Sequence, residues 1–197
     1  MRLKTLTDDL LAATLLPFIP HSVTPNQVSW VRIASLPFIY YFLVTGQYTP
    51  GFAIFIIAAL TDALDGAMAR TRDQITETGK VLDAVADRSL ITLLALVFIP
   101  EYFGWPLFIA LVALEISNAA MAYRSRRALG YNPGANWAGK LKMFIQCIAF
   151  GLLFAVLIWS APAWLVYVNW LLCFSLIFAI LQSFLYPTEL LATALDQ

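Results

Sequence analysis

The stretch DALDGAMARTRDQITETGKVLDAVADR, from Asp62 to Arg88, places four aspartates at regular intervals in an otherwise apolar region. The first two, Asp62 and Asp65, are three residues apart. The last two, Asp83 and Asp87, are four apart. Residues at these spacings share one face of a helix. Acids inside apolar helices are costly and mark functional sites, so the stretch predicts two helices that carry a polar site.

The composition of the chain indicates lipid as its solvent. Of its 197 residues, 61% are hydrophobic and 12% are charged, and the mean hydropathy is +0.78. A soluble domain of this size carries about 25% charged residues. We therefore expect an all-α integral membrane protein. The formal net charge is zero, which gives no reason to expect nucleic acid as a partner.

Six segments are long and apolar enough to cross a bilayer, which takes about 20 residues each. Glycines and prolines separate them. The predicted spans are residues 25–43, 50–70, 79–99, 106–123, 137–159 and 163–185. We expect residues 25–186 to form a six-helix bundle within one membrane-embedded domain, 1–197. Residues 1–20, with early acids and periodic leucines, predict an amphipathic helix at the membrane surface.

The positive charges predict the orientation. All 12 lysines and arginines lie in the N-terminal segment, in the loops after the second and fourth spans, or within about three turns of one of these. The loops after the other spans carry none. By the positive-inside rule, both termini and these two loops face the cytoplasm. We expect a multi-pass protein of the bacterial inner membrane.

The four aspartates, named here the acid cluster, are expected to meet. Two consecutive helices joined by a short loop run antiparallel, and the residue numbers place Asp62 opposite Asp87 and Asp65 opposite Asp83. Four neighbouring carboxylates need shared protons or a metal as counter-charge. Carboxylates are ligands that Mg²⁺ accepts, and four of them suit a pair of ions. The alternative is simple pairing with nearby basic side chains.

The same residues resemble a family signature. Asp62-x-x-Asp65-Gly66-x-x-Ala69-Arg70, followed by eight residues and Gly79-x-x-x-Asp83-x-x-x-Asp87, matches the signature of CDP-alcohol phosphatidyltransferases at every fixed position and in both gap lengths. The stretch TPNQVSWVR, which precedes the first span, is similar to the Pro-Asn-x-x-Thr/Ser opening common in that family.

The resemblance implies an enzyme and assigns residues to its site. Asp62, Asp65, Asp83 and Asp87 would hold two Mg²⁺ or Mn²⁺ ions, and Asp87 would also take the proton from the acceptor hydroxyl. The residues implied to line the CDP-diacylglycerol are Asp62, Gly66, Ala69, Arg70 and Gly79. The other substrate would be a small phosphorylated alcohol, in a surrounding of membrane lipids. Family members are commonly homodimers.

The acceptor is predicted from a second stretch, NWAGKLKMFIQ, which resembles the Gly-Lys-x-Lys-x-x-x-Gln segment of phosphatidylglycerophosphate synthases. Arg124, Lys140 and Lys142 are the candidates for holding an acceptor phosphate, and cations are what a phosphate needs beside an acidic site. Glycerol 3-phosphate is therefore the expected acceptor. Ala84 and Arg88 depart from that subgroup, so inositol phosphate stays open, as does phosphatidylglycerol in cardiolipin synthesis.

A transporter is the alternative from another functional class, because intramembrane acids can line an ion or proton pathway. The outer halves of the second and third spans, GFAIFIIAAL and LITLLALVFI, are unbroken apolar runs. No polar path through the membrane is visible in them. An inactive scaffold would not require four acids at these spacings. The sequence therefore favours a transferase.

Overall fold

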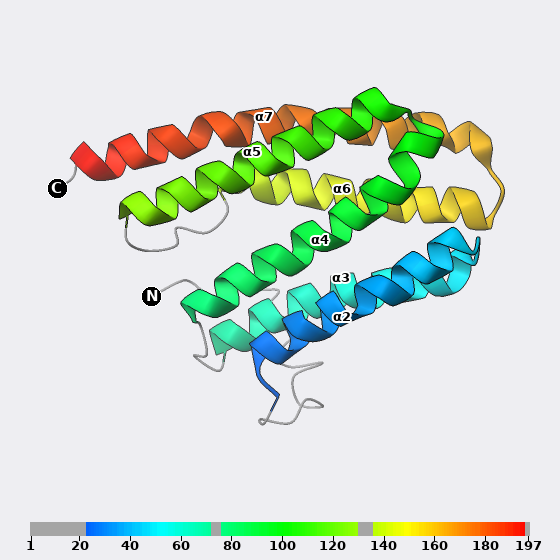
Figure 1. Cartoon of the computed structure of the whole chain (residues 1–197), viewed down its shortest axis with the longest axis horizontal. Helices are drawn as coiled ribbons and strands as arrows, with labels where there is room; N and C mark the ends of the chain where they lie inside the picture. The colour runs from blue at the N-terminus through cyan, green and yellow to red at the C-terminus, as the bar shows by residue number, and fades with distance from the viewer. Residues whose placement is uncertain (1–22, 72–75, 130–135, 196–197) are drawn as a thin grey trace. The chain divides into compact units, whose positions relative to one another are not determined.

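The structure is a computed structural model of the whole chain, and it describes residues 23–71, 76–129 and 136–195 (Figure 1). The described part contains helices and no strand. Its elements are α2 (Pro25–Val44), α3 (Tyr48–Thr71), α4 (Glu77–Tyr102), α5 (Trp105–Leu129), α6 (Trp137–Ile158), the short 3₁₀ helix η2 (Pro162–Trp164) and α7 (Leu165–Leu195). The predicted interfacial helix, 1–20, lies outside the described residues.

Contacts divide the chain into two compact units, Met1–Leu90 and Ile91–Gln197. The first unit holds α2, α3 and the beginning of α4. The second holds the rest of α4 and the helices that follow it. The single domain expected from the sequence stays a prediction, and each unit is described by itself.

In the first unit, α2 packs along α3 (Figure 1). A capping box starts α2: the backbone N–H of Gln27 donates to Thr24 Oγ1, and the backbone N–H of Thr24 donates to Gln27 Oε1. Pro25 follows the cap, where its missing N–H costs nothing. The capping box therefore defines where α2 begins, seven residues before Arg32.

In the second unit, α7 packs against both α5 and α6. The Asn136 side chain caps α6 by accepting from the backbone N–H of Gly139, and it donates to the backbone oxygen of Gln182 on α7. Between α5 and α7, the buried Asn118 side chain donates to the Ala179 backbone oxygen. Such interhelical bonds satisfy polar groups that lipid cannot.

Many large apolar side chains are exposed on the helices, among them Trp30, Ile57, Phe144 and Trp170. Large exposed apolar faces are incompatible with water but suit lipid. Together with the helices themselves, they confirm the predicted all-α membrane fold. By length and composition, five helices in the described part can cross a membrane.

The helix α4 is not among those five. It is 26 residues long, but its first half carries Lys80, Asp83, Asp87 and Arg88, which lower its hydropathy. The sixth span therefore stays a prediction. The helices also run past several expected ends, since Pro50 lies in the first turn of α3 and Pro100 in the last turn of α4. A proline costs little in a first turn, where the N–H groups have no partners inside the helix.

Candidate active site

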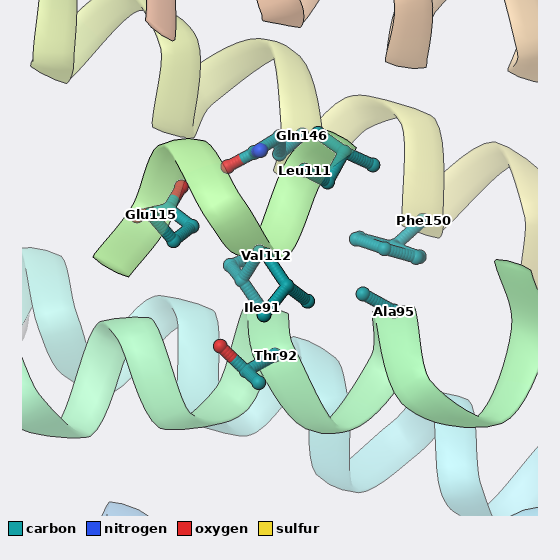
Figure 2. A pocket seen from close by; sticks show the side chains of 8 residues that line it. All are labelled: Ile91, Thr92, Ala95, Leu111, Val112, Glu115, Gln146 and Phe150. Atoms are coloured by element: carbon teal, nitrogen blue, oxygen red, sulfur yellow. The ribbon is translucent and has the colours of Figure 1, made fainter. Parts of the chain in front are cut away.

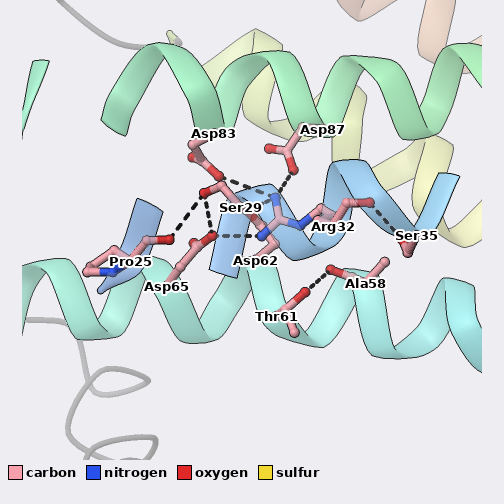
Figure 3. Close-up of polar contacts among 10 residues, drawn as sticks. All are labelled: Pro25, Ser29, Arg32, Ser35, Ala58, Thr61, Asp62, Asp65, Asp83 and Asp87. Atoms are coloured by element: carbon pink, nitrogen blue, oxygen red, sulfur yellow. Dashed lines mark hydrogen bonds and ion pairs between the residues drawn. The ribbon is translucent and has the colours of Figure 1, made fainter. Parts of the chain in front are cut away.

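The acid cluster surrounds one arginine. Arg32, from the middle of α2, is fully buried, and its Nη1 lies 3.3 Å from Asp62 Oδ1, 3.3 Å from Asp83 Oδ1 and 2.5 Å from Asp87 Oδ1. Its Nη2 lies 2.8 Å from Asp65 Oδ2. Figure 3 shows Asp62 and Asp65 reaching it from α3, and Asp83 and Asp87 from α4. One guanidinium thus contacts all four predicted acids.

Ser29 holds one acid of the cluster from the same helix. It lies three residues before Arg32, and its hydroxyl donates to Asp65 Oδ2 at 3.1 Å (Figure 3). Asp65 is the most buried of the four acids, with a side-chain exposure of 5%. It therefore has two fixed partners, which set the position of its carboxylate. Ser29 is the serine of the Pro-Asn-x-x-Ser opening.

The cluster is open at two of its acids. The side chains of Asp62 and Asp83 are 39% and 42% exposed, whereas that of Asp87 is 13% exposed. Asp65 and Arg32 are more buried still. Side-chain exposure therefore decreases from Asp62 and Asp83 to Asp87 and then to Asp65. A substrate or ion would therefore reach Asp62 and Asp83 first and Asp87 next.

The acid cluster fits divalent metal. Carboxylate oxygens from Asp62, Asp83 and Asp87 all lie within 4.8 Å of one another. Oxygens on opposite sides of a Mg²⁺ are ~4 Å apart, since each lies at about 2.0–2.1 Å, so a small side-chain adjustment brings the three onto one ion. One guanidinium also cannot neutralise four carboxylates. Both charge and donor type suit a hard cation such as Mg²⁺ or Mn²⁺.

Gly79 allows α2 and α4 to approach closely. A Cβ atom at this position would lie 2.5 Å from Asn26 Oδ1 and 2.8 Å from Thr76 Oγ1. The glycine therefore leaves room for the Asn26 side chain at the open end of the site. Gly66, the other predicted glycine, is half-buried in α3 beside Asp65. The side chains of Ala69 and Arg70 lie outside the described residues.

Sequence reasoning missed Arg32 and Ser29. In the sequence, Arg32 contributes only to the charges that predict the orientation, and Ser29 only to the Pro-Asn-x-x-Ser opening. A signal was present, because the two residues are three apart and so share a helix face. An arginine inside a predicted span also calls for a carboxylate partner.

In the second unit, the three predicted phosphate-binding residues differ in their surroundings. Arg124, on α5, and Lys140, on α6, are exposed. Lys142 is buried, and its Nζ lies 2.5 Å from Glu115 Oε1 on α5. The structure therefore shows Lys142 in an interhelical ion pair.

A small cavity lies beside this ion pair (Figure 2). Apolar side chains form most of its lining, with Thr92, Glu115 and Gln146 as the polar exceptions. The second carboxylate oxygen of Glu115 is buried and has no hydrogen-bond partner within the part of the chain that the structure describes. The cavity offers too few polar groups to hold a diphosphate.

Comparison with known proteins places the chain in a family. The model of the CDP-alcohol phosphatidyltransferase family matches residues 22–181, which include the acid cluster, Arg32 and the Glu115–Lys142 pair. The chain belongs to the CDP-alcohol phosphatidyltransferase family. It is therefore a membrane-embedded transferase of phospholipid biosynthesis, as the signature predicted.

Relatives and one solved structure agree with this assignment. The chain is 31% identical to the CDP-diacylglycerol–glycerol-3-phosphate 3-phosphatidyltransferase of Shigella flexneri serotype 5b, over 88% of this chain and 97% of the relative. The enzyme of the same name from Escherichia coli K12 is 30% identical over the same shares. A phosphatidylinositol phosphate synthase of Mycobacterium tuberculosis, crystallised with CDP-DAG bound, superposes with a TM-score of 0.63. That match covers 94% of this chain and 93% of the other at 22% identity. At this identity, the match shows only that the two folds are similar.

Removal of the lysine charge alone from the Glu115–Lys142 pair should destabilise this transferase more than removal of both charges. Lys142→Met would leave a buried carboxylate without its cation, which costs about 3–5 kcal/mol. We expect a clearly lower melting midpoint in detergent. The double variant with Glu115→Gln should recover most of the loss, and Lys140→Met, at an exposed site on the same helix, should change little. Equal midpoints for the two single lysine variants would contradict a stabilising pair.

Proposed function

We propose that the protein transfers the phosphatidyl group of CDP-diacylglycerol to the hydroxyl of glycerol 3-phosphate, which gives phosphatidylglycerophosphate and CMP. The convergence of the four signature aspartates carries this proposal. The names of the relatives that are about one-third identical over most of their length support the choice of acceptor. Nothing in the described part of the chain favours a transporter.

In this proposal Asp62, Asp65, Asp83 and Asp87 hold two divalent cations, with Mg²⁺ the first choice and Mn²⁺ the second. When bound, the cations neutralise the diphosphate and polarise the phosphorus that is attacked. The carboxylates of α3 and α4 position the diphosphate through these ions. Gly66, Ala69, Arg70 and Gly79 are proposed to line the CDP moiety, with Arg70 offering a planar set of donors to its oxygens.

Asp87 is proposed as the general base. It is the last acid of the signature, and its low exposure of 13% places it behind the open pair. It would take the proton from the acceptor hydroxyl, whose oxygen then attacks the phosphorus bound to the diacylglycerol. The bond between that phosphorus and the CMP oxygen breaks, and CMP leaves. The protein's main contribution is to hold the two substrates in line.

The acceptor phosphate is proposed to bind Arg124, Lys140 and Lys142. Arg124 and Lys140 are exposed, which leaves them accessible to a soluble phosphate. Lys142 is engaged with Glu115, yet an ammonium has three N–H donors, so that bond does not by itself prevent a second one to a phosphate. Glu115 would then also orient the lysine.

Inositol phosphate is the second candidate acceptor. Arg88 directly follows the fourth acid, and an Asp-Arg pair there resembles inositol-phosphate transferases. Phosphatidylglycerol is a third. The deciding assay gives the purified protein CDP-diacylglycerol and Mg²⁺ with glycerol 3-phosphate, inositol phosphate, phosphatidylglycerol or serine. We expect CMP release with glycerol 3-phosphate. Use of serine alone would contradict the phosphate site, and use of inositol phosphate would contradict only the choice of acceptor.

Loss of one phosphate contact should appear in the use of the acceptor. A hydrogen bond to a charged group contributes about 1.5–3 kcal/mol, or roughly ten- to a hundred-fold. We expect Lys140→Ala and Lys142→Ala to raise the KM for glycerol 3-phosphate by about that factor, while the KM for CDP-diacylglycerol changes little. Assays below the melting midpoint of each variant separate binding from unfolding. An unchanged acceptor KM in both variants would contradict the proposed site.

The remaining proposals concern the setting of the enzyme. We propose that both termini and the acid cluster face the cytoplasm from the bacterial inner membrane, as the distribution of lysine and arginine indicates. The homodimer implied by the family resemblance stays a prediction.

A further inference from the structure

We propose that Arg32 is a positioning residue: it holds the acid cluster together in the metal-free enzyme, and metal must displace it from three of the four acids. The inference rests on the proposed metal-dependent function and assigns a role to a residue outside the family signature. Its basis is the place of the guanidinium at the centre of the site (Figure 3).

The guanidinium and a bound metal compete for the same three carboxylates. Nη1 of Arg32 contacts one oxygen each from Asp62, Asp83 and Asp87, and these are the three residues whose oxygens lie within 4.8 Å of one another. A Mg²⁺ or Mn²⁺ that binds all three must lie at about 2.1 Å from each oxygen. Such an ion would lie directly against Nη1. Two cations cannot stay there together, so loading requires Nη1 to leave.

Without metal, the acids need this cation. Asp62, Asp65, Asp83 and Asp87 repel one another, and a buried charge without a partner is strongly destabilising. Arg32 is itself fully buried, with a side-chain exposure of 0%, so its own charge depends on the acids. Arginine suits this role because its fork reaches several carboxylates at once. The pairing therefore stabilises the acid cluster at the expense of metal affinity.

Asp65, the fourth acid, can keep its contact with Arg32 when the other three acids bind metal. Nη2 contacts Asp65 Oδ2 at 2.8 Å, and Ser29 donates to the same oxygen. The Nε atom of Arg32 is buried and has no hydrogen-bond partner among the described residues. A turn of the guanidinium about its contact with Asp65 would release the other three acids and leave Nε–H free to find an acceptor. Ser29 would meanwhile keep Asp65 in position.

The test measures Mn²⁺ binding to detergent-purified protein from the loss of the free-ion signal in electron paramagnetic resonance. Arg32→Met removes the competing cation at similar side-chain length, and we expect it to bind Mn²⁺ at least tenfold more tightly than the unaltered protein. It should also melt at a lower temperature in chelator and gain more from added Mn²⁺. Arg32→Lys, which keeps a charge but reaches fewer acids, should lie between the two.

Arg88→Met is the matched control, because it removes a cation next to Asp87 that makes no ion pair with the four acids in the described structure. It should strengthen Mn²⁺ binding far less than Arg32→Met. Equal gains would show a general charge effect and overturn the proposal. If Arg32→Met does not fold, Arg32→Lys decides: tighter Mn²⁺ binding than in the unaltered protein supports displacement, and equal or weaker binding overturns it.

These outcomes are separate from those for the proposed function. CMP release by the unaltered protein, together with unchanged Mn²⁺ affinity in Arg32→Met, overturns the role of Arg32 and leaves the transferase proposal intact. Tighter Mn²⁺ binding in Arg32→Met by a protein that transfers no phosphatidyl group supports the role of Arg32 and contradicts the proposed function.

Discussion

Asp87→Asn is expected to lower the turnover of CMP release by about 10²- to 10⁴-fold, the usual range for loss of a general base. An amide of the same size cannot accept the proton of the acceptor hydroxyl. The loss should fall at the upper end of that range, because Asp87 is also a proposed metal ligand. Turnover is measured at saturating substrates and Mg²⁺, and CDP-diacylglycerol binding is measured separately and should change far less.

Glu101→Gln supplies the control for this variant. Glu101 lies on the same helix, α4, but it is exposed and near the other end of the helix. Its replacement removes one carboxylate without touching the acid cluster, and turnover should be unchanged. Normal turnover in Asp87→Asn would mean that another group takes the proton.

Removal of divalent metal is expected to abolish CMP release, and added Mg²⁺ should restore it. The negative charge of the diphosphate and of four carboxylates would otherwise meet with too little positive charge to compensate it. Asp65→Asn should leave little activity at any Mg²⁺ concentration, since a ligand charge is lost while the bonds with Ser29 and Arg32 can be partly kept. CMP release is measured in chelator and across a Mg²⁺ titration.

This second experiment has to distinguish a loss of folding from a loss of metal binding. The Asp65→Asn protein should still insert into the membrane and elute as the unaltered protein does in detergent. Full activity in chelator would contradict any metal role for the acid cluster. Activity of Asp65→Asn that returns fully at high Mg²⁺ would mean that Asp65 only adjusts metal affinity.

Helical spacing predicted the meeting of the four aspartates correctly. The pairs at three and four residues fix one face of each helix, and a short connection makes the helices antiparallel. The expected facing pairs, Asp62 with Asp87 and Asp65 with Asp83, stay a prediction. Local sequence therefore predicts that the four acids meet.

Arg32, the cation that the acid cluster surrounds, could not be predicted from helical spacing. Arg32 is 30 positions before Asp62 and lies on another helix, so its place depends on how α2 rotates against α3 and α4. That rotation is set by side-chain packing between helices, which apolar periodicity does not encode. The expected orientation of the spans also accounts for a cation at this position through the positive-inside rule, without a contact with the acids.

The Glu115–Lys142 pair shows the same limit. The two residues are 27 apart on different helices, and sequence reasoning placed Lys142 toward a phosphate because cations near an acidic site suggest one. Helix ends differ from the expectation for another reason: the expected third span ends before Pro100, whereas α4 continues to Tyr102. Pro100 removes one helical hydrogen bond, because it has no N–H to donate to the backbone oxygen four residues earlier, and α4 ends two residues after it.

The most direct test of the account is a single assay of the purified protein with CDP-diacylglycerol, glycerol 3-phosphate and Mg²⁺, in which CMP and lipid product are both quantified. The account predicts that CMP and phosphatidylglycerophosphate form in equal amounts, and that neither forms when glycerol 3-phosphate or metal is left out. Formation of CMP without a new lipid, or of neither product by a folded protein, would contradict it.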